Sequence, residues 1–144
     1  MKTAVLNLFR RILGLLGFAA AGASCGETIA NMACMYGVPT MDYSVSGKVQ
    51  NASGDPIEGI EVTSEEDFEG ARALTSPDGS FTLGSRAFPA DTISISFNDV
   101  DGVQNGEYKD NTVKVPLKKT AKGDGSWYSG KYEAAGVVVT MEKK

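Results

Sequence analysis

The stretch TISISFN, residues 92–98, decides the fold class of this 144-residue chain. Its apolar and polar side chains alternate throughout, so that Ile93, Ile95 and Phe97 share one face. A period of two is typical of a β-strand with one face in the core and the other in water. The stretch therefore predicts a strand that buries these three side chains.

The same alternation recurs on both sides of this strand. In TVKVPL, residues 112–117, the apolar side chains share a face, and Pro116 has no N–H to donate, so this strand is expected at a sheet edge. YSVSGKV, residues 43–49, alternates in the same way, and Ile60 and Val62 are expected to point inward. Together these patterns predict one shared, dry interior.

Turn-forming residues separate the predicted strands. NASGDP, residues 51–56, is a dense turn signal, and Pro77-Asp78-Gly79 predicts the tight turn of a β-hairpin. A final apolar run, GVVVTM, precedes a charged tail. About seven short strands separated by turns predict an all-β fold, a single antiparallel β-sandwich over residues 42–144.

Composition argues against several classes of protein. The chain contains no histidine, which is the commonest general base and the commonest zinc ligand. Residues 25–144 carry 11 basic and 18 acidic side chains, because three of the 14 basic residues and none of the acidic ones precede Cys25. This acidic balance disfavours binding to a nucleic-acid backbone, which requires clustered lysine and arginine. We therefore expect neither an enzyme nor a nucleic-acid-binding protein.

The first 24 residues have the pattern of an export signal. Residues 1–11 carry three positive charges, and the next twelve, ILGLLGFAAAGA, are apolar or glycine. This run fits the apolar region of a secretory signal and is shorter than the ~20 residues that a membrane span requires. Small residues then lead to Cys25 in the sequence GASC.

This boundary resembles the lipobox of bacterial lipoproteins, although Gly22 stands where leucine is usual. The resemblance implies a signal peptide over residues 1–24 and cleavage before Cys25. It also implies that acyl chains such as palmitate are attached to the cysteine, and two or three such chains make membrane anchoring stable. Residues 25–41 would then link the anchor to the folded domain.

Two alternatives to a lipoprotein stay open at this point. A plain secretory signal cleaved after Ala23 also satisfies the rule of small residues at the cleavage site, and the segment could instead be retained as a core helix. For a lipoprotein, Gly26 and Glu27 lack the aspartate associated with inner-membrane retention in some bacteria, so the outer membrane is expected. Cys34 would be left as a single thiol and is expected to pack as an apolar residue.

Two segments within residues 44–83, VSGKVQNASGDPIEGIEV and TSPDGSFTL, resemble the carboxypeptidase regulatory-like domains. The resemblance implies a transthyretin-like sandwich in which the turn at Asp78-Gly79 directs Phe81 inward. It implies no activity, because such domains accompany enzymes or receptors without performing chemistry themselves.

Four further blocks resemble the radical SAM-associated lipoproteins of Bacteroidota. They are MYGVPTMDYSVSGKV, FNDVDGVQNGEY, VPLKK and GDGSWYSGKYEAAGVVVTMEKK, and they follow the signal that ends in cysteine. The resemblance covers nearly the whole chain and implies the fold and the localisation, but no catalytic residues. It also raises the alternative that the protein is a substrate or accessory of a radical SAM modifying system.

The acidic loop NDVDGVQNGEYKD, residues 98–110, is a candidate calcium site. Asp99, Asp101 and Glu107 would supply the hard oxygen ligands that calcium prefers. The EF-hand spacing is absent, because with Asp99 in the first position Gln104 stands where glycine is required. The alternative is a solvated turn whose side chains bond to their own backbone.

The segment GDGSWYSGKYEA, residues 123–134, contains the only tryptophan. Trp127 and Tyr128 would face opposite sides of a strand, and an exposed aromatic ring could stack on a sugar as a ligand platform. We nevertheless expect Trp127 to pack between the sheets, as large aromatic side chains usually do.

The sequence thus predicts a membrane-anchored, non-enzymatic lipoprotein of the cell envelope. It would act as a binding or assembly module for an unidentified protein or glycan. The alternative is a calcium- or carbohydrate-binding surface lipoprotein that uses the acidic loop or the Trp127 region. The run Glu65-Glu66-Asp67 is expected to be a solvated loop.

Overall fold

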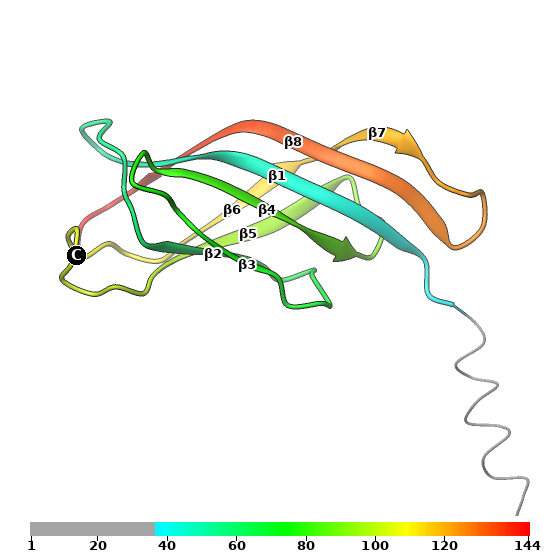
Figure 1. Ribbon diagram of the computed structural model, residues 1–144, viewed down its shortest axis with the longest axis horizontal. Coiled ribbons are helices and arrows are strands. Elements are labelled where there is room, and N and C mark those ends of the chain that lie inside the picture. The colour runs from blue at the N-terminus through cyan, green and yellow to red at the C-terminus, as the bar shows by residue number, and fades with distance from the viewer. Residues whose placement is uncertain (1–36) are drawn as a thin grey trace, which may run out of the picture. The chain divides into compact units, whose positions relative to one another are not determined.

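The computed structural model describes residues 37–144 (Figure 1). The expected signal peptide, residues 1–24, lies outside the described residues, as do Cys25 and Cys34. Within the described part of the chain, no helix has the length and hydrophobicity needed to cross a membrane. The strands are β1 (Thr40–Asn51), β2 (Ile60–Ser64), β3 (Arg72–Leu74), β4 (Ser80–Ala87), β5 (Thr92–Asp99), β6 (Asn111–Pro116), β7 (Lys118–Lys122) and β8 (Tyr128–Met141).

The strands form two packed four-stranded sheets, so the predicted all-β sandwich is confirmed. The strand orders are β4-β1-β8-β7 and β3-β2-β5-β6, and the two layers are visible in Figure 1. The structure has eight strands where about seven are predicted, and β7 is the additional one. One detail of the prediction is wrong, because β1 and β8 are parallel rather than antiparallel. The parallel pairing arises because β8 begins beside the start of β1, with Tyr128 opposite Thr40.

The alternation read from the sequence matches the burial of the side chains. Ile93, Ile95 and Phe97 are fully buried, Val115 is buried as well, and Phe81 meets Phe97 edge-on with ring centroids 5.4 Å apart. Burial of each such side chain contributes about 2 kcal/mol to stability. The other buried apolar residues are Met41, Tyr43, Val45, Val49, Ile57, Ile60, Val62, Leu83, Ala87, Tyr108, Leu117, Val139 and Met141.

One continuous segment closes a side of the sandwich. β6 lies at the edge of its sheet, as Pro116 predicts, and the chain then passes through the buried Leu117 into β7 at the edge of the other sheet. All five residues of β7 are exposed, and three of them are lysines. Lysines on an edge strand oppose pairing with the sheets of other molecules.

The turn predicted at Pro77-Asp78-Gly79 is present, but it does not form a hairpin. The amide of Gly79 donates to the carbonyl of Ser76 at 2.8 Å, and Gly79 has a φ of 74°, which glycine adopts without strain. The strands on either side, β3 and β4, belong to different sheets. The local sequence therefore specifies the turn. Because β3 and β4 pair with different strands, the turn connects the two sheets instead of joining two neighbouring strands.

Candidate functional site

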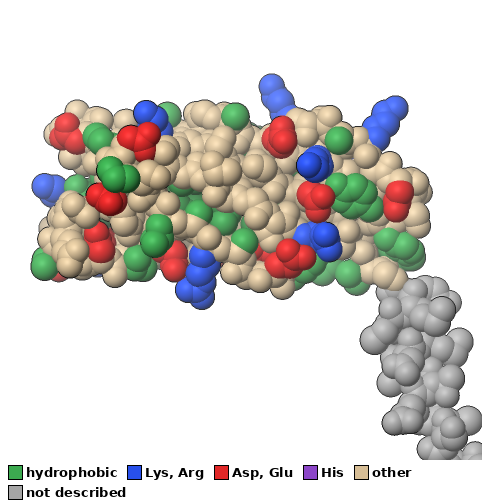
Figure 2. Space-filling model, viewed as in Figure 1, with side chains coloured by type: hydrophobic (Ala, Val, Ile, Leu, Met, Phe, Trp, Pro, Cys, Tyr) green, Lys and Arg blue, Asp and Glu red, His purple; other side chains and the backbone are tan. Residues whose placement is uncertain are grey.

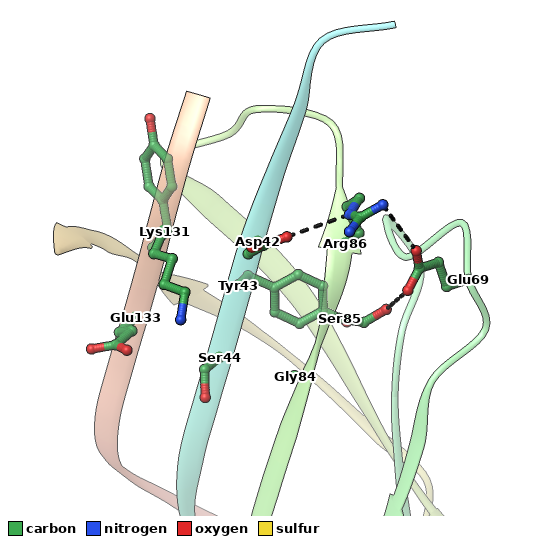
Figure 3. Close-up of a pocket in the computed structure, with 10 residues that line it drawn as sticks. Asp42, Tyr43, Ser44, Glu69, Gly84, Ser85, Arg86, Lys131 and Glu133 are labelled. Atoms are coloured by element: carbon green, nitrogen blue, oxygen red, sulfur yellow. Dashed lines mark hydrogen bonds and ion pairs between the residues drawn. The ribbon is translucent and has the colours of Figure 1, made fainter. Parts of the chain in front are cut away.

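A hollow of about 300 Å³ lies on the outer face of β4, β1 and β8 (Figure 3). Successive side chains of a strand point to opposite faces. Because the ring of Tyr43 is buried in the core, its neighbours Asp42 and Ser44 face outward. We call this hollow the outer-face pocket. Its small and charged outward-facing residues are Asp42, Ser44, Gly84, Arg86, Lys131 and Glu133.

The strand register explains why the sheet is hollow at this point. Ser44 pairs with Gly84 on one side and with Glu133 on the other. In the next outward-facing row, Asp42 lies between Arg86 and a lysine of β8. In the first row, Gly84 has no side chain and Ser44 has only a short hydroxyl group. The second row carries charged side chains. The short row therefore forms the floor, and the charged side chains form the wall.

Charged groups of opposite sign meet at the wall of the outer-face pocket. The guanidinium of Arg86 lies 3.4 Å from Asp42 and 3.6 Å from Glu69, which reaches over from the β2–β3 loop. The hydroxyl of Tyr128 donates to the other oxygen of Asp42 at 2.8 Å, and this hydrogen bond raises the pKa of Tyr128. Within residues 37–144, the charged residues that β8 contributes to the pocket make no ion pair. They are the charges that a ligand could engage without displacing an existing partner.

The β2–β3 loop joins the two sheets beside the pocket. Asp67 accepts hydrogen bonds from two backbone amides of its own loop, at 2.7 and 2.8 Å, and from the hydroxyl of Ser85 at 2.9 Å. Glu66 accepts from the amide of Ser94 at 2.9 Å. Burial disfavours both charges, but the hydrogen bonds outweigh it and lower the pKa of both carboxyls. The expectation of a solvated loop is therefore wrong for Glu66 and Asp67, whereas Glu65 is exposed, and we call residues 65–71 the clasp loop.

Tyr43 lies between the outer-face pocket and the clasp loop. Its hydroxyl is buried and makes no hydrogen bond of ordinary geometry, although Ser64 and Asp67 lie close enough to influence it. Burial, followed by the negative charge of Asp67, raises the pKa of Tyr43. The tyrosine is therefore neutral at physiological pH and contributes packing rather than charge.

The two aromatic residues of the predicted ligand platform have different surroundings. Trp127 is 48% exposed, so the expectation that it packs between the sheets is wrong. The reason is its place in the β7–β8 turn, outside both strands, where its carbonyl accepts the amide of Thr40 at 2.7 Å. Tyr128, the first residue of β8, instead reaches the outer-face pocket through Asp42.

The predicted calcium ligands are not brought together. Asp99 accepts the amide of Tyr108 at 2.8 Å, Asp101 accepts the side-chain amide of Asn105 at 2.9 Å, and Glu107 is exposed. No group of three acidic, histidine or cysteine side chains within the described residues could hold a metal ion. These hydrogen bonds match the alternative of a turn that bonds to itself.

The charged residues of the outer-face pocket, above all Arg86 and Lys131, are missed by sequence reasoning. Alternation shows that they face outward, but it does not reveal that β4, β1 and β8 are neighbours. Comparison of the chain with models of protein families and with curated proteins finds no match.

Proposed function

We propose that this protein is a membrane-anchored, non-enzymatic lipoprotein of the cell envelope that binds a partner through the outer-face pocket. The anchor is inferred from the sequence around Cys25. The binding role is supported by one observation above all, which is that charges of both signs surround a floor of short residues on the outer face of the sheet.

The openness of this pocket favours recognition over catalysis. Asp42 is already paired with Arg86, and that guanidinium is half exposed to solvent. Acid–base catalysis gains most from a site that excludes water, where a charge acts in a medium of low dielectric constant. A wet surface with fixed donors and acceptors is instead suited to hydrogen-bonded and ionic contacts with another molecule.

The test is capture of partners from native envelopes by the acylated protein, with one variant that fills the pocket. Ser44→Arg places a long side chain on the floor, while Thr82→Arg places the same side chain on the outer face of β4 outside the pocket lining. A partner that is retained by Thr82→Arg and lost by Ser44→Arg is the expected result. Equal capture by the two variants would contradict the role assigned to the pocket.

Carbohydrate binding is a second candidate, favoured by the exposure of Trp127 next to Tyr128. An exposed indole can stack on a sugar ring, and the neighbouring Asp42 could accept hydrogen bonds from sugar hydroxyls. Titration with oligosaccharides from the envelope would then quench or shift the fluorescence of the single tryptophan. An unchanged emission spectrum at saturating oligosaccharide would count against this candidate.

A further inference from the structure

The exposed aromatic residues gather at one end of the sandwich. Trp127 is in the β7–β8 turn, Phe68 in the clasp loop and Phe88 just after β4, and these three are 48%, 47% and 54% exposed. Phe68 and Phe88 contact each other with ring centroids 5.4 Å apart. In Figure 2, hydrophobic side chains reach the surface near the point where the described chain begins.

The strand register places these residues at a common level. The carbonyl of Trp127 accepts a hydrogen bond from the amide of Thr40. Ala87, which precedes Phe88, pairs with Met41. β8 and β4 lie on either side of β1, so the two loops are separated by roughly two strand spacings, or 10 Å. Val38, just before β1, is also 56% exposed. We call this end of the sandwich, with Val38, Phe68, Phe88 and Trp127, the entry end.

We propose that the entry end rests on the surface of a zwitterionic phospholipid bilayer, with Trp127 in the headgroup region. This inference depends on the proposed lipid anchor at Cys25. Indole rings favour the membrane–water interface, and exposed apolar side chains grouped at one end of a domain mark a site of interaction.

The length of the tether supports this orientation. Fourteen residues lie between Cys25 and Thr40, so the tether spans at most about 50 Å of extended chain. β8 alone, with 14 residues, runs about 45 Å away from the entry end. To present the opposite end to the bilayer, the tether would have to stretch along almost the whole domain. The entry end therefore reaches the membrane at a much lower entropic cost.

The charges near the entry end indicate contact without electrostatic attraction. Lys122 is the last residue of β7, Asp124 lies on the same exposed turn as Trp127, and the carboxylates of the clasp loop are close to Phe68 in the sequence. Because these charges do not form a basic patch, attachment to anionic lipid would not be favoured. We expect contact with the bilayer to be insensitive to salt concentration.

The single tryptophan makes the proposal directly testable. The acylated full chain is reconstituted in zwitterionic phospholipid vesicles, and quenching of Trp127 by brominated lipid is compared with quenching by iodide. We expect strong quenching by lipid brominated near the headgroups and a several-fold lower iodide quenching constant than for an exposed tryptophan. Neither quantity should change with salt.

The control moves the tryptophan to the opposite end of the sandwich. Trp127→Phe combined with Val103→Trp places the only indole in the β5–β6 loop, at a position that is 81% exposed. This variant should be quenched by iodide and not by brominated lipid. A second variant, Phe68→Ser with Phe88→Ser, should keep the protein on the vesicles while iodide quenching of Trp127 rises several-fold.

The outcomes separate this proposal from the proposed anchor. A protein that floats with the vesicles while iodide quenches Trp127 as strongly as it quenches the Val103→Trp control overturns the orientation alone. If an oligosaccharide then protected Trp127 from iodide, Trp127 would be a glycan-binding residue rather than a membrane contact. A protein that does not float and has an unmodified Cys25 overturns the anchor, and the orientation with it.

Discussion

At the scale of single residues, two buried side-chain oxygen atoms within residues 37–144 have no hydrogen-bond partner, the hydroxyl of Tyr43 and Oδ1 of Asp99. The hydroxyl of Tyr43 is buried without a hydrogen bond. A buried polar group without a partner destabilises the folded state, because it loses its bonds to water and gains none. Tyr43→Phe should therefore raise the free energy of unfolding, by up to about 1 kcal/mol, as measured by denaturant titration. The comparison is Tyr128→Phe, which removes a hydroxyl that is hydrogen-bonded to Asp42 and should lower the free energy of unfolding. Destabilisation by Tyr43→Phe would contradict this assignment.

Gly47 in β1 gives a second prediction at the residue scale. A Cβ atom at this position would overlap the backbone carbonyl of Val137 in β8. Backbone atoms cannot move aside as a flexible side chain can, so Gly47→Ala should lower the free energy of unfolding by about 2–3 kcal/mol. Ser46→Ala, one position away, should change it by less than about 0.5 kcal/mol. If both variants were equally stable, β1 and β8 could not approach each other as closely as described.

At the scale of elements, the clasp loop links stability to pH. The pKa values of Glu66 and Asp67 are lowered in the folded protein, from about 4 in the unfolded chain. Below about pH 5 the unfolded state therefore binds more protons, and stability is lost as the pH falls through 4 towards the folded pKa values. Asp67→Ala should cost about 2 kcal/mol at pH 7 and flatten this acid-side loss. Glu65→Ala, at an exposed position in the same loop, should leave both the stability and its pH dependence unchanged. An unaltered acid slope in Asp67→Ala would rule out this role.

Some strands can be predicted from the sequence and others cannot. β5 is recognised from alternation alone because one of its faces is buried and the other is wet. β7 and the first half of β8 are not, because β7 is exposed on both faces and Gly130 and Gly136 interrupt the pattern of β8. The parallel pairing of β1 with β8 also escapes prediction, since it depends on which distant strands meet. The outer-face pocket is missed for the same reason. The burial of Trp127 is predicted wrongly because large aromatic side chains are usually buried, whereas Trp127 lies in the turn between β7 and β8 and is exposed.

At the scale of the whole molecule, different parts of the domain have different roles. The core between the sheets provides stability, the outer-face pocket is proposed to bind a partner, and the entry end is proposed to face the bilayer. Lysines along β7 protect an open sheet edge from pairing with other molecules. The role of the entry end requires that the segment preceding Thr40 tethers the domain to the membrane, because a freely diffusing sandwich would have no preferred orientation at a bilayer.

Both proposed surfaces depend on the lipid anchor, which mass spectrometry of the mature protein from the membrane fraction would detect. We expect an amino-terminal peptide that begins at Cys25 and carries the mass of a diacylglycerol group with or without a third acyl chain. A mature protein recovered in the soluble fraction with a free thiol at Cys25 would contradict it.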